Sequence, residues 1–222
     1  MSAAAYAAAA GARFLRGGAF KPRSSPYSFN GHGRQALDWL RAAARAHNLG
    51  VVTEVMSELE VETVAEVADL VQIGSRNMQN YALLSRVGRC ARPVLLKRGM
   101  AATVEEWLLA GEHLLAAGCP GVVFCERGIH SFDPSTRNLL DLGAVAVLRH
   151  AYRLPVVVDP SHAAGRRDLV VALAKAAVAC GAHGLIVESH PNPAAALSDG
   201  PQALLPEQLS ALGFATPPGE TS

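Results

Sequence analysis

The sequence has few of the features that mark membrane, secreted or nucleic-acid-binding chains. Aromatic residues make up 5% of its 222 residues, and the formal net charge of +1 provides no broad basic face for a nucleic acid or an anionic membrane. No apolar run approaches the ~18 residues that span a bilayer. The four cysteines form no CxxC pair and no regular disulfide framework, so we expect reduced thiols and a cytoplasmic protein.

The alanine-rich opening lacks the charged and leucine-rich parts of a signal peptide, so residues 1–14 predict a helix instead. Half of the residues are hydrophobic (50%), which suffices for a well-buried core. About 200 to 250 residues is the usual size of a single α/β barrel, and no Pro/Ser-rich linker divides the chain. We therefore expect one domain over residues 1–222, with a disordered tail at 214–222.

Short apolar runs rich in β-branched residues recur along the chain and do not alternate with polar residues. This pattern is typical of parallel strands buried on both faces. Strands are predicted at 12–15, 50–53, 70–74, 93–96, 121–125, 155–158 and 184–187. Helices are predicted at 34–48, 58–67, 77–87, 103–117, 137–151, 166–180 and 202–212. The alternation indicates an α/β fold, a (β/α)8 TIM barrel that lacks its first strand.

A charged residue follows nearly every predicted strand. The carboxyl ends of parallel strands form the mouth of a barrel, where barrel enzymes bind their substrates. A purely structural role would scatter such charges over helix faces. Cations converging at the mouth would repel one another unless an anion lay between them, which favours small phosphorylated or carboxylated substrates. These cations are Arg16, Lys21, Arg23, Arg76, Lys97 and Arg127.

A different set of residues follows the last two predicted strands. His162, Glu188 and, further along, Asp199 offer one imidazole and two carboxylates, which suit a divalent ion such as manganese, iron or zinc. A histidine after a strand is also common as a hydrogen-bonded structural residue, and Asp199 followed by Gly200 is typical of a turn. The spacing alone leaves both interpretations open.

Several segments resemble the 3-deoxy-7-phosphoheptulonate (DAHP) synthases, in particular their short class I type, which is also similar to the 3-deoxy-octulosonate 8-phosphate synthases. The similar segments run in order over nearly the whole chain, and KPRSSPYSF favours the heptulosonate branch. They include LRGGAFKPRSSPYSFNG (15–31), VVTEV (51–55), QIGSRNMQN (72–80), PVLLKRG (93–99), CERG (125–128), STRNLLDLGAV (135–145), VVDPSHAAGRRDLV (157–170) and GAHGLIVESHPNPAAALSDG (181–200).

The resemblance implies a transferase that condenses phosphoenolpyruvate with erythrose 4-phosphate in an aldol-like reaction, the first step of the shikimate pathway. Family members are commonly homo-oligomers, so the resemblance also implies association. The implied phosphoenolpyruvate-binding residues are Arg16, Lys21, Arg76, Lys97 and Arg127. Those implied for erythrose 4-phosphate are Lys21, Pro22, Arg23 and Ser24, and those for the metal are His162, Glu188 and Asp199. The implied catalytic residues are Lys97, Glu54, His162 and Asp159, with Lys97 and Glu54 as candidates to activate water.

The sequence departs from the family pattern at its N-terminus. Family members begin the barrel with a strand that ends in Gly-Pro-Cys, and this cysteine is the fourth metal ligand; the sequence has no such segment. A mis-set start codon or incomplete gene, a truncated paralogue, and a partner chain that fills the gap are three explanations. Two further functions stay open: a catalytically impaired barrel that binds phosphorylated metabolites or a partner, and the sister enzyme that uses arabinose 5-phosphate.

Overall fold

A curled parallel sheet forms the centre of the molecule. The computed structural model describes the chain except residues 1, 21–26, 28–30 and 214–222. Seven strands follow one another around the sheet in chain order, and every neighbouring pair is parallel. The strands are β1 (Phe14–Arg16), β2 (Gly50–Val55), β3 (Leu70–Ile73), β4 (Val94–Lys97), β5 (Val122–Glu126), β6 (Val156–Val158) and β7 (Gly184–Leu185).

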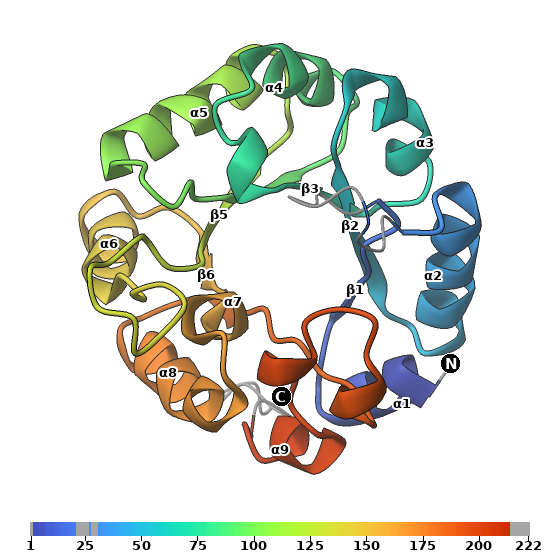
Figure 1. Ribbon diagram of the computed structural model, residues 1–222. Helices are drawn as coiled ribbons and strands as arrows, with labels where there is room; N and C mark the ends of the chain where they lie inside the picture. The colour runs from blue at the N-terminus through green and yellow to red at the C-terminus, as the bar shows by residue number, and fades with distance from the viewer. Residues whose placement is uncertain (1, 21–26, 28–30, 214–222) are drawn as a thin grey trace, which may run out of the picture.

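Most helices lie outside the strands and form an outer ring, whereas α7 lies beside β6 and nearer the centre than α8 (Figure 1). They are α1 (Ser2–Ala9), α2 (Arg34–Ala46), α3 (Val61–Ala65), α4 (Tyr81–Gly88), α5 (Val104–Ala116), α6 (Leu142–Ala146), α7 (Pro160–Ala164), α8 (Arg167–Ala179) and α9 (Pro206–Ser210). Within the described residues β1 and β7 are the edges of the sheet and do not pair with each other. The predicted α/β barrel, with seven parallel strands, is confirmed, and so is the helix at the N-terminus.

Short helical turns complete the connections. They are the 3₁₀ turns η1 (Glu58–Glu60), η2 (Ser75–Asn77), η4 (Pro193–Ala195) and η5 (Gly200–Gln202), and the π-helical turn η3 (Val147–Ala151), which continues α6. The tail predicted at 214–222 lies outside the described residues, so its disorder stays a prediction.

In helix α5, side chains cap the N-terminus of the helix and also attach the helix to the sheet. The hydroxyl of Thr103 accepts a hydrogen bond from the Glu106 backbone N–H at 3.1 Å, and the Glu106 carboxylate accepts one from the Thr103 backbone N–H at 2.8 Å. This reciprocal cap satisfies N–H groups that the helix itself cannot pair. One turn further on, the buried Trp107 indole donates to the Leu96 carbonyl at 3.1 Å and so fixes α5 against β4.

One local prediction was wrong, and one helix was missed. Residues 137–141 are not helical, because the side chain of Asp141 caps the Ala144 N–H at 2.9 Å and α6 begins only at Leu142. Helix α7 was not predicted at all, although Asp159 accepts a hydrogen bond from the His162 N–H at 2.9 Å and Pro160 occupies the first turn. An N-cap aspartate followed by proline is a helix-start signal, and the short length of α7 concealed it.

The main hydrophobic core lies between the sheet and the helices. It takes alternate residues of the strands, such as Ile73, Leu96 and Phe124, and packs them against α4, α5 and α6. A smaller cluster of Val52, Leu95 and Cys125 lies on the opposite side of the same strands, inside the barrel. Successive strand residues point to opposite faces, so the charged residue two positions after each inner apolar residue also points inward.

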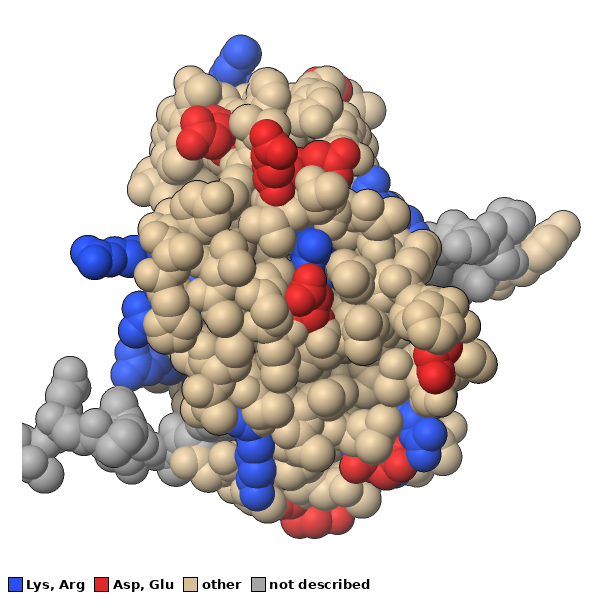
Figure 2. Space-filling model, turned by 90° about the vertical axis from the view of Figure 1, so that its left-hand side faces the viewer, with Lys and Arg blue, Asp and Glu red and all other residues tan. Residues whose placement is uncertain are grey.

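The outer surface carries charges of both signs. On the face shown in Figure 2, acidic (red) and basic (blue) side chains are scattered among uncharged residues (tan), and the basic ones do not form a single patch. Within the described part of the chain, no helix has the length and apolar character needed to cross a membrane.

Candidate active site

A cavity of about 400 Å³ opens at the carboxyl ends of the strands. The inner-face alternation explains its lining, because Glu54 lies two residues after Val52, Lys97 two after Leu95 and Arg127 two after Cys125. The lining residues are Arg16, Gly18, Phe20, Glu54, Gln72, Gly74, Ser75, Arg76, Lys97, Met100, Arg127, His130, Arg137, Asn138, His162 and Asp199.

Most of the predicted site residues meet at this cavity. Seven of them line it, namely Arg16, Glu54, Arg76, Lys97, Arg127, His162 and Asp199. Asp159 and Glu188 are bonded to lining residues, as described below. The predicted residues Lys21, Pro22, Arg23 and Ser24 lie outside the described residues, so their roles stay predictions.

Asp159 forms hydrogen bonds with two other predicted site residues, Lys97 and His162. Its Oδ2 atom accepts hydrogen bonds from Lys97 Nζ at 2.5 Å and from His162 Nδ1 at 2.7 Å. The Asp159 side chain is fully buried, and Lys97 is nearly so. Burial alone would raise the pKa of Asp159, but the charges and hydrogen bonds of His162 and Lys97 hold that pKa well below its usual value. Asp159 is therefore an anion that orients both the lysine and the imidazole.

His162, Glu188 and Asp199 form a group that could hold a metal ion. One donor atom from each lies within 4.8 Å of the others. His162 Nε2 is 3.9 Å from Glu188 Oε1 and 3.9 Å from Asp199 Oδ1. Because Nδ1 of the ring is held by Asp159, Nε2 is the nitrogen left to face the carboxylates. One imidazole and two carboxylates, with the imidazole oriented by Asp159, fit a divalent ion such as manganese, iron or zinc.

Arg16 is tied into a chain of polar groups that crosses the barrel. Its guanidinium donates to Glu188 Oε1 at 2.7 Å and to Gln72 Oε1 at 2.8 Å. The Gln72 amide in turn donates to Glu54 Oε2 at 2.9 Å. Burial by itself would lower the pKa of Arg16, yet Glu188, Glu54 and Asp159 outweigh it, and the pKa is raised. Arg16 is thus a permanent cation whose guanidinium is already engaged with protein groups.

Arg127 is in the opposite situation. It is 9% exposed, and its buried Nη1 atom has no hydrogen-bond partner among the described residues. Burial lowers the pKa of Arg127, and Asp159 only partly opposes this effect. A buried, unpaired guanidinium facing a cavity is costly for the folded chain unless an anion binds there.

An ion cluster fixes the strand ends next to Lys97 and Arg127. Arg98 Nη1 donates to Glu126 Oε2 at 3.0 Å and to Asp141 Oδ2 at 2.8 Å. The other oxygen of Glu126 accepts the Gly128 N–H at 2.6 Å. Arg98 follows β4 and Glu126 ends β5, so the cluster holds the ends of two neighbouring strands in register.

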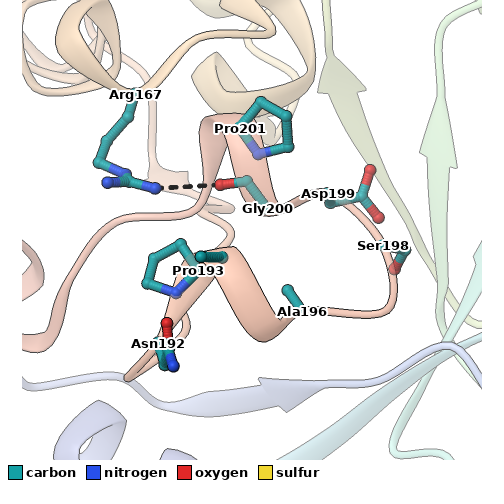
Figure 3. A pocket seen from close by; sticks show the side chains of 9 residues that line it. Arg167, Asn192, Pro193, Ala196, Ser198, Asp199, Gly200 and Pro201 are labelled. Carbon is teal, nitrogen blue, oxygen red and sulfur yellow. Dashed lines mark hydrogen bonds between the residues drawn. The ribbon is translucent and has the colours of Figure 1, made fainter.

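A second cavity, of about 590 Å³, lies beside the loop that carries Asp199 (Figure 3). Its cation, Arg167, donates to the carbonyls of Ala203 at 2.5 Å and Gly200 at 3.1 Å, which holds the loop in place. Most of its remaining lining is proline, alanine and glycine. Because its cation is already used within the protein, we place the functional site at the smaller, charged cavity.

The sequence analysis did not single out Gln72, Arg137 and Asn138, although all three line the cavity. Gln72 is a polar residue inside an apolar strand, and this feature could have identified it. Arg137 and Asn138 were assigned to a helix that is not present, which removed them from the set of strand-end residues.

Comparisons with known proteins show the family to which the chain belongs. The profile of the DAHP synthetase I family matches residues 1–216. The chain belongs to this family. The phospho-2-dehydro-3-deoxyheptonate aldolase of Thermotoga maritima is 52% identical over 204 residues, which are 92% of this chain and 60% of the relative. A 2-dehydro-3-deoxyphosphooctonate aldolase of Acidithiobacillus ferrooxidans is 36% identical over 194 residues, 82% of this chain and 68% of that protein.

Solved structures also show that this DAHP synthetase family member is similar to DAHP synthases. The crystal structure of the Thermotoga maritima DAHP synthase superposes with a TM-score of 0.92 at 50% identity, over 95% of this chain and 62% of that chain. The chain therefore spans about 60% of the length of the Thermotoga relative. The identities favour the heptulosonate branch over the octulosonate branch, as the KPRSSPYSF segment predicts.

Proposed function

We propose that the chain condenses phosphoenolpyruvate with erythrose 4-phosphate to give 3-deoxy-D-arabino-heptulosonate 7-phosphate and phosphate. The observation that carries this proposal is the buried, unpaired guanidinium of Arg127 beside Lys97 in a cavity that also reaches the His162, Glu188 and Asp199 group. An anion bound at Arg127 would thus lie close to the group that could hold a metal ion. Family membership and the 52% identical heptonate aldolase support this choice of substrates.

The residues have distinct tasks in this proposal. Arg127 and Arg76 bind the phosphate and carboxylate of phosphoenolpyruvate, because neither guanidinium has a carboxylate partner among the described residues. Lys97 lies next to them and is held in place by Asp159. Arg16 contributes mainly positive charge, because its donors are engaged by Glu188 and Gln72. Together these groups hold two anions close enough to react.

The chemistry joins C3 of phosphoenolpyruvate to the aldehyde carbon while water adds at C2, and phosphate then leaves by cleavage of its C–O bond. A bound divalent ion would act as a Lewis acid on the aldehyde oxygen. Glu54 and Lys97 are the candidates to move the proton of the attacking water. Gln72 fixes Glu54 by a hydrogen bond at 2.9 Å, so its carboxylate is oriented before substrate enters.

Three finer expectations belong to the same proposal. The ion is manganese, iron or zinc, the chain forms a homo-oligomer, and the protein is cytoplasmic. Metal analysis of protein purified without chelator tests the first expectation, and light scattering in solution tests the second. Fractionation of the source cells tests the third.

The deciding experiment follows phosphoenolpyruvate consumption by the purified chain, with and without erythrose 4-phosphate and with and without manganese. Turnover that needs both the sugar and the metal supports the proposal. Consumption with arabinose 5-phosphate in place of erythrose 4-phosphate would favour the sister reaction. A folded chain that binds phosphoenolpyruvate without turnover would instead be a metabolite-binding member of the family.

A further inference from the structure

Glu126 is a buried carboxylate at the end of β5, directly before Arg127. The Glu126 side chain is completely buried, whereas that of Arg127 lines the cavity. Burying a carboxylate is costly unless hydrogen bonds and a nearby cation compensate for the lost water. The contacts of Glu126 therefore indicate why a charged residue occupies this position.

Both oxygens of the Glu126 carboxylate accept hydrogen bonds. Oε1 accepts one from the Gly128 N–H at 2.6 Å, and Oε2 accepts one from Arg98 Nη1 at 3.0 Å. The backbone carbonyl of Glu126 accepts a third, from the Asp159 N–H at 2.8 Å. Glu126 thus connects the end of β5 to the residue that follows β4, to the residue that follows β6 and to the backbone after Arg127.

The hydrogen bond to Gly128 encloses the backbone of Arg127. It joins the side chain of the residue before Arg127 to the N–H of the residue after it, so a rotation of the backbone at Arg127 would break it. Gly128 has φ of +94°, and a Cβ there would lie 2.6 Å from Asn138 Cβ. The chain therefore has little freedom on that side. Because a side chain follows the direction of its backbone, these contacts orient the Arg127 guanidinium towards the cavity.

Nearby carboxylates favour the charge of Arg127 while they bond to other residues. Burial lowers the pKa of Arg127, and the charges of Asp159 and Glu126 oppose this effect. The Asp159 side chain accepts hydrogen bonds from Lys97 and His162, and Glu126 accepts its own as described above. Within the described part of the chain, Nη1 of Arg127 therefore stays without a partner. An anion in the cavity would meet a charged group that still has a donor to offer.

Arg98 holds the Glu126 carboxylate in one orientation. Arg98 Nη1 also donates to Asp141 Oδ2 at 2.8 Å, and Arg98 Nε donates to the Ala102 carbonyl at 3.0 Å. The guanidinium carbon lies 5.8 Å from the centre of the Trp107 ring. A guanidinium bonded through two of its nitrogens is fixed in direction, so the carboxylate that it contacts is fixed as well.

We propose that Glu126 is a positioning residue, which holds the backbone at Arg127 so that the Arg127 guanidinium faces the anion bound in the cavity. This inference rests on the proposed function, in which the anion is phosphoenolpyruvate. Glu126 acts only through Arg127 and does not contact the substrate. An amide cannot replace it, because a glutamine would present its NH₂ group either to the Gly128 N–H or to Arg98, which are both donors.

The test compares Glu126→Gln with the parent protein by calorimetric titration of phosphoenolpyruvate. The variant should bind phosphoenolpyruvate about tenfold more weakly or worse, because Arg127 is no longer held towards the anion. Asp141→Asn is the matched control. It removes the other carboxylate from the same Arg98 nitrogen, and asparagine still caps α6. Its affinity for phosphoenolpyruvate should change by less than about threefold.

A double-mutant cycle separates positioning from a general structural role. In an Arg127→Met background, Glu126→Gln should change the affinity for phosphoenolpyruvate by less than about twofold, because the residue through which it acts is gone. Affinities too weak for calorimetry are obtained from the rise of the melting midpoint with phosphoenolpyruvate concentration. Circular dichroism shows whether each variant folds. Glu126→Asp keeps the charge but is too short for both bonds, and it takes the place of Glu126→Gln if that variant does not fold.

The outcomes separate this inference from the proposed function. If the parent binds phosphoenolpyruvate and Glu126→Gln binds it equally well, the role of Glu126 is refuted and the proposed function stands. An equal loss in Asp141→Asn, or an undiminished loss in the Arg127→Met background, would also refute it, because the effect would then come from damage to the ion cluster. A parent that binds no phosphoenolpyruvate would overturn both ideas.

Discussion

Lys97 Nζ lies 2.5 Å from Asp159 Oδ2, in an ion pair that is almost completely buried. Replacing Asp159 by asparagine should lower the free energy of unfolding by about 3 kcal/mol, because the lysine charge stays buried without its counter-ion. Urea denaturation at neutral pH measures the loss. Asp168→Asn, which removes an exposed partner of Arg166, should cost far less, and an equal loss in both variants would contradict the argument.

The effect of Asp159→Asn should depend on pH. Burial opposes ionisation of Asp159, but His162 and Lys97 outweigh it and hold its pKa well below the usual value. The unfolded chain then binds the proton more readily, so the carboxylate stabilises the fold above its unfolded pKa of about 3.9. This contribution is lost as the pH falls further, towards the folded pKa. The difference between parent and variant should be constant from neutral pH to about 5 and shrink below about 4. A difference that grows on acidification would rule out this assignment.

A divalent ion should stabilise the folded chain through His162, Glu188 and Asp199. Manganese or zinc at about a hundredfold excess over its dissociation constant should add about 2.7 kcal/mol, or roughly 5 °C or more in the melting midpoint. Glu188→Gln should abolish most of the shift, because the group loses one of its charged donors. Glu105→Gln in the first turn of α5 serves as a control for a general loss of negative charge. The same shift in parent and Glu188→Gln would place the ion elsewhere.

Cys125 should be chemically inert in the folded protein. It is fully buried inside the barrel, and burial raises its pKa to about 12. The thiolate is the reactive form, so alkylation at pH 8 should modify the half-buried Cys90 and Cys180 well before Cys125. Mass spectrometry of iodoacetamide-treated protein, with and without denaturant, follows each thiol. Rapid labelling of Cys125 in the native protein would be incompatible with this packing.

Gly165→Ala should destabilise the protein, because Gly165 ends α7 in the left-handed region with φ of +68°. Alanine in the left-handed conformation costs about 1–2 kcal/mol, and its Cβ would also meet Arg137 Cβ at 2.6 Å. Gly121→Ala is a suitable control, because a Cβ there meets nothing within 4 Å. Thermal melting of both variants measures the change in stability. Gly165→Ala should lower the melting midpoint and Gly121→Ala should leave it unchanged; an equal effect of both substitutions would contradict the argument.

Most of the strands and helices could be predicted from local sequence patterns. The β-branched runs placed all seven strands to within a few residues, because strands buried on both faces have to be apolar throughout. Thr103 and Glu106 fixed the start of α5 because the cap is a contact within one turn. The pattern failed at 137–141, where the connection from β5 to α6 is held by hydrogen bonds to α7 and not by local preference.

The candidate site could be predicted only in part. The strand-end rule and the family resemblance named Lys97, Arg127 and His162, all of which line the cavity. The pairing of Lys97 with Asp159 could not be read from the sequence, because the residues are 62 positions apart and meet only through the order of the strands. Gln72 was missed although a polar residue inside an apolar strand could have marked it, and Arg137 was missed because it was assigned to a helix that begins only at Leu142.

The ion pair between Arg16 and Glu188 has a consequence for the ring as a whole. Arg16 ends the first described strand and Glu188 follows the last, so their contact at 2.7 Å connects the two sides of the gap in the sheet. Glu188 is also one of the three residues that could hold a metal ion. An ion that draws the Glu188 carboxylate away from Arg16 would therefore weaken the ion pair across the gap. Ion binding would then change how closely the two edges of the sheet are held together.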